Sequence, residues 1–201
     1  MKDKNKLFSL TLTAAFLALI VVMSFTPIGY LKVGVIEITL LVLPVVLGAI
    51  TVGTGAGVFL GFAFGATSFI QCFGMSPFGA AMLSIQPVYT AIVCFVPRVL
   101  LGLCAGLLFS ALKKTKLPLP VSAGLTALCA SLINTVGFVG LLVLLFGKTE
   151  YIQGLMETLG SPNLWAFALA FAGVNSLVEA AANTVLGGAI GSVLLKLKQR
   201  I

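Results

Sequence analysis

Five polar side chains lie inside apolar stretches that are long enough to cross a lipid bilayer. They are Arg98, Asn134, Asn175, Glu179 and Asn183. A charge or carboxamide in hydrocarbon is costly, so such groups normally face a protein interior or a water-filled cavity and mark a functional site. Guanidinium, carboxylate and carboxamide groups recognise ions and hydrogen-bonding partners. The pattern therefore predicts an internal site for a small polar molecule.

Arg98 needs an anion or a group of acceptors deep in the membrane. It lies about ten residues into its apolar stretch, which places it roughly 15 Å from the end of a helix. At that depth the side chain does not easily reach the membrane surface. Three partners are open: Glu179, a carboxylate or phosphate of a substrate, or a set of backbone carbonyls. The planar guanidinium suits a carboxylate bound through two parallel hydrogen bonds.

Asn175, Glu179 and Asn183 recur every four residues, so they lie on one face of the last apolar helix. Small residues surround them in the sequence, which indicates that this face looks inward. We expect Asn175 to contact a ligand, and Glu179 and Asn183 to act as structural hydrogen-bond partners. Asn134 lies near the middle of another apolar stretch, and its carboxamide suits an amide or hydroxyl of a ligand. A hydrogen bond between helices is the alternative role for Asn134.

The residue content argues against catalysis. The chain has no histidine, which excludes histidine metal sites and Ser/His/Asp sets, and it has no nucleotide-binding motif or Gly-rich phosphate loop. We therefore expect no enzyme activity, metal or cofactor in this chain, and any step driven by ATP would need partner subunits. The four cysteines lack CxxC spacing and are interpreted as small hydrophobic residues. They are Cys72, Cys94, Cys104 and Cys129.

The composition indicates an integral membrane protein. Of the 201 residues 60% are hydrophobic and 8% are charged, whereas a soluble domain carries about 25% charged residues. We predict an all-α bundle of six transmembrane helices in one domain over residues 1–201. The expected spans are about 7–25, 38–52, 56–73, 88–112, 121–146 and 164–195.

Details within and between these spans can also be predicted. Pro44 is expected to kink or break the short second span. Residues Tyr30–Glu37 and Gly74–Pro87 are expected to form loops, and a short amphipathic helix is expected around Tyr151–Leu159.

The basic residues predict the orientation in the membrane, because loops on the cytoplasmic side carry an excess of lysine and arginine. With both termini in the cytoplasm, nine basic residues face the cytoplasm and two face outward. The nine are Lys2, Lys4, Lys6, Lys113, Lys114, Lys116, Lys196, Lys198 and Arg200, and the two are Lys32 and Lys148. The longer loops then face outward, as they would in a protein that receives something from outside.

Two patterns of small residues predict close helix packing. Gly53, Gly57, Gly61 and Gly65 repeat every four residues in the third span. Packing between helices of the same chain is the plain interpretation of this glycine stripe. Ala14 and Ala18 form a similar pair in the first span, and their pattern alone does not decide what they contact.

Three segments resemble a known family: TPIGY at residues 26–30, VPRVLLG at 96–102 and GVNSLVEA at 173–180. Together with the six expected spans and the long outer loops, they resemble the S components of energy-coupling factor (ECF) vitamin transporters. An S component is the substrate-binding subunit of such a transporter. The resemblance covers essentially the whole chain, and it is strongest to the pantothenate group.

The resemblance implies a multi-pass protein of the bacterial cytoplasmic membrane, with a vitamin site near its outer side. It implies as partners a transmembrane scaffold subunit and two ATPase subunits, which use the ATP. In this family an Ala-x-x-x-Ala motif on the first helix docks the scaffold, and here that motif falls on Ala14 and Ala18. The resemblance also implies transport by toppling of the S component in the bilayer.

The chain is thus predicted to be the S component of an ECF-type ABC importer for pantothenate or a similar small anionic vitamin. Arg98 would bind the carboxylate, and Asn134 and Asn175 would bind the amide and hydroxyls. One alternative is an S component for another water-soluble vitamin, such as riboflavin, a pyridoxine-like compound or folate. Another is a membrane assembly protein in which Arg98 simply pairs with Glu179.

Overall fold

The computed structural model describes residues 2–26, 29–33 and 36–198, and the side chains of residues 2–5, 30–38, 172, 174 and 175 lie outside the description. Long apolar helices dominate it. In chain order the elements are α1 (Lys2–Ser24), β1 (Tyr30–Val33), β2 (Ile36–Thr39), α2 (Val42–Thr51), α3 (Thr54–Gln71), α4 (Pro77–Ile85), α5 (Pro87–Leu112), α6 (Leu119–Phe146), α7 (Glu150–Thr158) and α8 (Leu164–Lys198).

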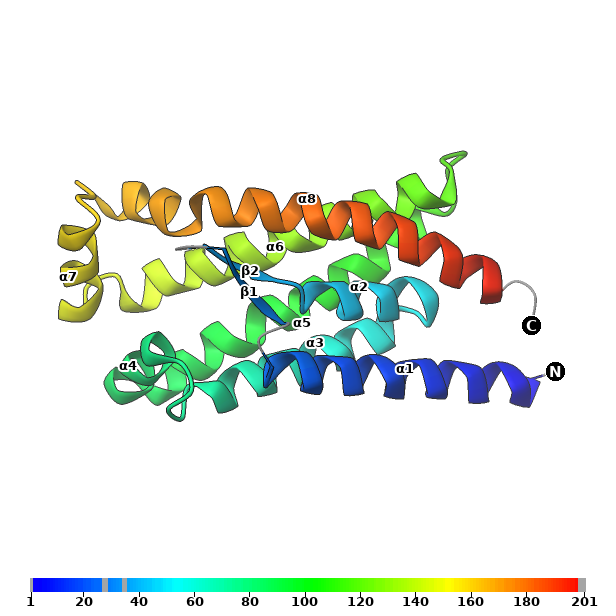
Figure 1. Ribbon diagram of the computed structural model, residues 1–201, viewed down its shortest axis with the longest axis horizontal. Helices are drawn as coiled ribbons and strands as arrows, with labels where there is room; N and C mark the ends of the chain where they lie inside the picture. The colour runs from blue at the N-terminus through cyan, green and yellow to red at the C-terminus, as the bar shows by residue number, and fades with distance from the viewer. Residues whose placement is uncertain (1, 27–28, 34–35, 199–201) are drawn as a thin grey trace.

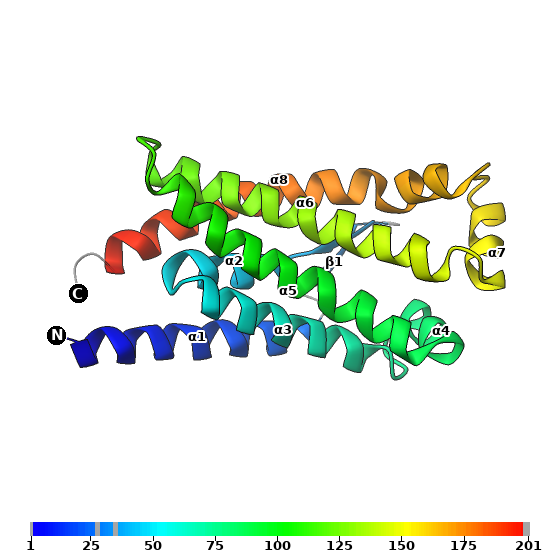
Figure 2. The same cartoon turned by 180° about the vertical axis from the view of Figure 1, so that it is seen from behind.

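The long helices run side by side in an elongated bundle (Figure 1). The two ends of the chain and the turn between α5 and α6 lie at one end of the bundle, and α4 and α7 lie at the other (Figures 1 and 2). α6 packs along α8 and α5, and α3 packs along α5. The three clusters of lysines that the sequence pattern singled out therefore belong to elements that meet at one end.

Five helices in the described part of the chain are long and apolar enough to cross a membrane. The sixth expected span, residues 38–52, has a different form. Its first residues complete β2, and the rest form α2, whose ten residues cover only about 15 Å, half of a bilayer core. Every residue of α2 except Leu43 is buried, because neighbouring helices enclose it. Pro44 lies in the first turn of α2, where proline is tolerated, so it does not kink α2. The expected second span is instead interrupted before Val42, where α2 begins.

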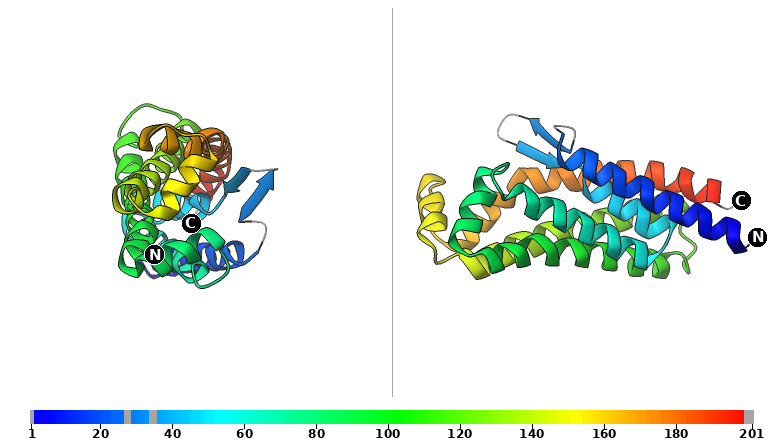
Figure 3. Two further views of the ribbon diagram at one scale, coloured as in Figure 1. Left: turned by 90° about the vertical axis from the view of Figure 1, so that its left-hand side faces the viewer. Right: turned by 90° about the horizontal axis from the view of Figure 1, so that it is seen from below.

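Two segments expected to be loops contain regular structure. β1 and β2 pair antiparallel, with Tyr30 opposite Thr39, and this hairpin lies on one side of the bundle against α8 (Figure 3). Residues 74–87 contain α4, whose N-cap Ser76 accepts a hydrogen bond from the backbone N–H of Gly79 at 3.1 Å. The amphipathic helix expected at Tyr151–Leu159 corresponds to α7.

The core has two apolar clusters. The larger joins α1, α2, α3, α5, α6 and α8 through residues such as Ile20, Val45 and Leu101. The smaller joins α4, α5, α6, α7 and α8 at the other end through residues such as Phe146 and Phe167.

The outer surface of the helices is apolar as well. Leu144, Trp165 and Leu169 are among many large hydrophobic side chains that are exposed. Soluble monomers rarely expose apolar surface on this scale. Together with the five spans, it identifies a multi-pass membrane protein with polar groups inside and apolar groups outside.

Candidate functional site

The glycine stripe fixes the position of α5 behind Arg98. A Cβ atom added to Gly61 would collide with the backbone oxygen of Arg98, and one added to Gly57 would lie 2.6 Å from the carbonyl oxygen of Gly102. The two helix backbones therefore approach so closely that only glycine fits. The stripe packs helices of the same chain against each other, and it sets where Arg98 enters the interior.

Pro97 determines which backbone group the Arg98 side chain binds. Proline has no N–H, so Pro97 inside α5 cannot donate the helical hydrogen bond to the carbonyl of Val93. Nη1 of Arg98 donates to that carbonyl oxygen at 2.7 Å. The guanidinium thus replaces the bond that the neighbouring proline removes. Because Val93 lies five residues nearer the start of α5, the side chain is directed toward the α4/α7 end of the bundle.

Two aromatic rings hold the guanidinium from the sides. The Cζ atom of Arg98 lies 5.4 Å from the ring centroid of Phe64 on α3 and 4.9 Å from that of Phe138 on α6. Both distances are in the range of cation–π attraction. The charge therefore sits in the interior, between α3, α5 and α6.

Asn134 lies one turn from Phe138 on α6 and is buried. Glycine again allows the approach, because a Cβ at Gly137 would touch the side chain of Pro97 at 3.2 Å. The predicted pairing of Arg98 and Asn134 in one region is therefore consistent with the contacts of α5 and α6.

Glu179 and Asn183 on α8 face the same interior. Nδ2 of Asn183 donates to Oγ of Ser131 on α6 at 3.0 Å, and Ser131 lies one turn from Asn134. Glu179, one turn from Asn183, is buried and accepts a hydrogen bond from the backbone N–H of Thr39 at the end of β2. The charge of Arg98 also acts on Glu179. α5, α6, α8 and β2 therefore converge on one polar interior.

The Asn175 side chain lies outside the described residues, so its predicted contact stays a prediction. Its backbone follows an interruption of α8 at Gly173, where φ is 10° and ψ is −128°. The hydroxyl of Ser176 donates to the carbonyl of Gly173 at 3.0 Å. The part of α8 before Gly173 packs with α4 and α7, and the part after it carries Asn175, Glu179 and Asn183.

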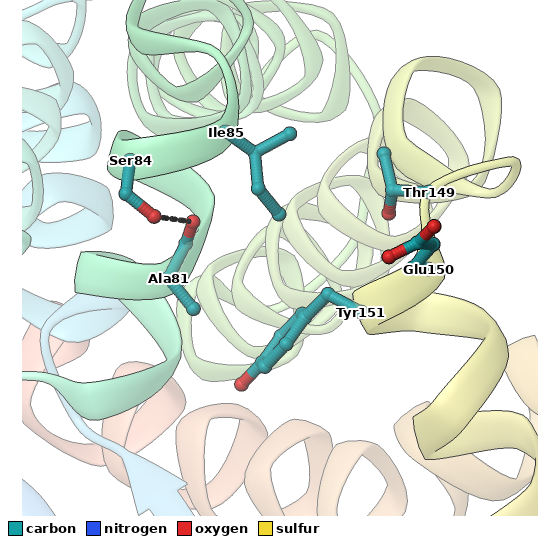
Figure 4. A pocket seen from close by; sticks show the side chains of 6 residues that line it. All are labelled: Ala81, Ser84, Ile85, Thr149, Glu150 and Tyr151. Carbon is teal, nitrogen blue, oxygen red and sulfur yellow. Dashed lines mark hydrogen bonds between the residues drawn. The ribbon is translucent and has the colours of Figure 1, made fainter.

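A cavity of about 400 Å³ lies between α4 and α7. It is lined by Ala81, Ser84, Ile85, Thr149, Glu150 and Tyr151 (Figure 4). Among the predicted polar residues whose side chains the structure describes, Arg98, Asn134, Glu179 and Asn183 do not line it. Phe78 joins α4 to α7 and α8, with ring centroids 6.0 Å from Tyr151 and 5.4 Å from Phe171. The hollow therefore lies at the end of the bundle toward which Arg98 is directed.

Ala14 and Ala18 lie on the outer face of α1. Phe16 and Ile20 are buried, whereas Ala14 and Ala18 are exposed. The alanines thus form a small-residue surface that no part of the described chain covers.

The sequence did not reveal the contacts that hold the polar side chains. Val93, Phe64, Phe138 and Thr39 bind Arg98 or Glu179 through a carbonyl, two rings and a backbone N–H. The one available signal was the proline directly before Arg98, which frees a carbonyl one turn away. Among the described residues no group of three His, Cys, Asp or Glu side chains could hold a metal ion.

Comparison with known proteins gives the family. The family model described as "ECF transporter, substrate-specific component" matches residues 8–189. The chain is 30% identical to the "Pantothenate transporter PanT" of Leuconostoc mesenteroides, covering 98% of this chain and 97% of the relative. It is 28% identical to the "Pantothenic acid transporter PanT" of Lactococcus lactis, covering 96% of each chain. The match over nearly the full length confirms the resemblance, and the chain belongs to the substrate-specific components of ECF transporters.

Proposed function

We propose that this chain binds pantothenate for import as the S component of an ECF transporter. Two relatives that match it over nearly their full length carry names of pantothenate transporters. The observation that carries the assignment is the position of Arg98, whose guanidinium is held in the interior by the Val93 carbonyl and two aromatic rings. A cation in that position favours an anionic ligand over a cationic one.

Pantothenate has one carboxylate, one amide and two hydroxyls. We assign the carboxylate to Arg98, because a planar guanidinium suits a carboxylate bound through two parallel hydrogen bonds. Asn134 and Asn175 bind the amide and hydroxyls in this proposal. The burial of Asn134 one turn from Phe138, which contacts Arg98, supports a common site.

Import requires partners in this proposal. ECF S components work with a scaffold and ATPase modules, and we assign to this chain one transmembrane scaffold subunit and two ATPase subunits that hydrolyse ATP. The exposed Ala14 and Ala18 would dock the scaffold. Substrate would enter through the cavity between α4 and α7, and toppling of the chain in the bilayer would carry the site to the cytoplasm.

Calorimetric titration tests the carboxylate assignment. Pantothenate and its uncharged alcohol analogue, pantothenol, are titrated into wild type, Arg98→Ala and Arg98→Lys. Wild type should strongly prefer the acid. Loss of a charge-assisted contact in a desolvated site costs about 2–5 kcal/mol, roughly thirty-fold to several-thousand-fold in affinity, so Arg98→Ala should lose most of that preference. Arg98→Lys keeps the charge without the planar fork and should bind weakly but measurably.

A thermal-unfolding measurement without ligand separates binding from folding. Arg98→Ala also leaves the Val93 carbonyl without its donor, which costs about 1–3 kcal/mol of stability. If Arg98 served only to neutralise Glu179, removing both charges would restore stability and binding together. Equal affinity of wild type for the acid and the alcohol would refute carboxylate recognition.

A further inference from the structure

Three buried oxygen atoms in the polar interior have no hydrogen-bond donor within the described part of the chain. They are Oδ1 of Asn134, Oε1 of Glu179 and Oδ1 of Asn183. We infer that these oxygens form an acceptor subsite for the hydroxyl and amide N–H groups of the ligand, with Glu179 and Asn183 in direct contact with it. This inference rests on the proposed function and adds two ligand-binding residues and an orientation to it.

The three side chains are buried, so solvent does not readily supply hydrogen-bond donors to their oxygen atoms. Asn134 is 8% exposed, Glu179 is 7% exposed and Asn183 is fully buried. Buried polar atoms nearly always have a hydrogen-bond partner, because an unmet one costs free energy. Three such atoms of one kind, close together, therefore indicate a missing group that supplies donors.

The contacts of the three residues place them in one region. Asn183 donates to Ser131, and Asn134 lies one turn further along α6. Glu179 lies one turn from Asn183, about 6 Å along α8. Because α6 and α8 run in opposite directions, the turn from Ser131 to Asn134 and the turn from Asn183 to Glu179 lead toward the same end of the bundle. The acceptors therefore lie side by side on facing helices.

The chemistry of the acceptors matches the donor-rich part of pantothenate. The ligand has two hydroxyls and one amide N–H, which together offer three donors, and it has a carboxylate at the opposite end. The Glu179 carboxylate repels another carboxylate and accepts a hydrogen bond from a hydroxyl. The Arg98 guanidinium attracts a carboxylate and donates hydrogen bonds to it. Recognition thus uses one cation for the acid and three acceptors for the donors.

The positions of these groups give the ligand a direction. The Arg98 guanidinium is directed toward Val93 and hence toward the α4/α7 end. Asn134 and Asn183 lie further from that end than Phe138, the α6 residue in contact with the guanidinium. The ligand therefore enters with its hydroxyls first and its carboxylate toward the α4/α7 end.

The backbone N–H of Thr39 holds the Glu179 carboxylate in place. Glu179→Gln keeps the size of the side chain and an oxygen for Thr39, but removes the charge from the acceptor. It is therefore a variant that separates ligand contact from the attachment of the hairpin.

The experiment is a calorimetric cycle on the purified full chain. Wild type and Glu179→Gln are titrated with pantothenate and with an analogue in which both hydroxyls are replaced by hydrogen. We expect Glu179→Gln to bind pantothenate about tenfold to a hundredfold more weakly, as for a lost hydrogen bond to a charged group. It should bind the dehydroxylated analogue as wild type does. Glu157→Gln, an exposed change on α7, is the control and should alter neither affinity.

Two results would overturn the inference. One is that Glu179→Gln weakens both ligands by the same factor, which would mean that Glu179 only supports the fold through Thr39. The other is that wild type itself binds pantothenate and the dehydroxylated analogue equally, which would mean that other groups, such as water, occupy the acceptors. This second comparison uses wild type alone, so it tests the inference even if Glu179→Gln does not fold. If wild type bound no pantothenate at all, the proposed function would fail instead.

Discussion

At the scale of single residues, Pro97 and Arg98 act as a pair. Pro97 removes a backbone hydrogen bond inside a membrane-spanning helix, where no solvent is present to replace it. Arg98 supplies the missing donor at 2.7 Å, and this bond orients the guanidinium between Phe64 and Phe138. Arg98 thus supplies the hydrogen bond that is missing from its own helix and places a cation in the interior. The proline is a positioning residue, because it acts on a ligand only through Arg98.

Pro97→Ala tests this pairing. Alanine restores an N–H that competes with Arg98 for the Val93 carbonyl, so the guanidinium loses its fixed orientation. We expect the melting temperature to stay the same or rise, while the preference for pantothenate over pantothenol falls by about threefold to tenfold, equivalent to roughly one lost hydrogen bond. Calorimetry with both ligands and thermal unfolding provide the two measurements.

Pro87→Ala is the matched control for Pro97→Ala. Pro87 begins α5, where a proline removes no helical bond, so this change should leave the preference for the acid intact. An unchanged preference in Pro97→Ala as well would show that the proline does not position Arg98.

At the scale of helices, glycine decides how close α3 and α5 approach and therefore where Arg98 points. Gly57, Gly61 and Gly65 meet Gly102, Arg98 and Cys94 with Phe95 across the contact. In lipid, helix association depends on close packing of this kind, because lipid tails offer no hydrophobic driving force between helices. A methyl group at the contact must move a backbone rather than a flexible side chain.

Gly61→Ala should therefore lower stability and binding together. The added Cβ would press on the carbonyl of Arg98, and overpacking of this kind costs roughly 1–3 kcal/mol. Gly55→Ala in the same helix has open space around its Cβ and should be neutral or slightly stabilising. Thermal unfolding and pantothenate titration of both variants give the comparison. Equal melting temperatures for the two variants would contradict a tight α3–α5 contact at Gly61.

The helices also show which parts of the fold can be read from sequence. Long apolar runs with basic flanks determine their own structure in a membrane, so the expected range 88–112 differs little from α5, and 121–146 little from α6. Short elements depend on their neighbours. The β1–β2 hairpin has strands of four residues and gains support from α8, and α2 is stable as ten residues only because other helices enclose it.

The candidate site also has features that local sequence predicts and features that depend on neighbouring elements. Residue type and spacing identified Arg98, Asn134, Glu179 and Asn183 as inward-facing, because polarity in an apolar run carries that information. Their partners are backbone groups and rings on other elements, such as the Thr39 N–H and Phe64, and those contacts depend on tertiary packing. The proline before Arg98 is the one part of these contacts that the sequence shows directly, because the loss of a helical N–H is a local property.

At the scale of the whole molecule, the distribution of lysines and the arrangement of the helices both distinguish the two ends of the bundle. The start of α1, the turn between α5 and α6 and the end of α8 carry most of the lysines and lie together (Figure 1). α4, α7 and their cavity lie at the opposite end. The excess of basic residues predicts that the lysine-rich end faces the cytoplasm.

Cysteine labelling tests this orientation. In a cysteine-free background, Thr115→Cys lies in the turn between α5 and α6, and Gly154→Cys lies on α7, and both positions are exposed. A membrane-impermeant maleimide added to intact cells should label Gly154→Cys, and should label Thr115→Cys only after the membrane is opened. The reverse pattern would invert the orientation and place the cavity in the cytoplasm.

The small-residue face of α1 is the part of the molecule that a partner would contact. Ala14 and Ala18 are exposed one turn apart, while Phe16 and Ile20 fix the opposite side of α1 to the bundle. α1 can therefore accept a neighbouring helix at close range without changing its own packing. A face of small residues is suited to a partner that must bind and release, because it buries little surface while allowing backbones to approach.

Ala14→Trp and Ala18→Trp should each abolish co-purification with the ECF scaffold and stop pantothenate uptake. The indole ring would hold the two helices apart, whereas the interior around Arg98 lies on the far side of the buried stripe of α1 and stays intact. Pantothenate binding to the isolated variants should therefore match wild type, which separates a docking defect from a folding defect. Ala170→Trp, a change at an exposed alanine of α8, is the control and should still assemble with the scaffold. Normal assembly and uptake by both α1 variants would show that the scaffold binds another face.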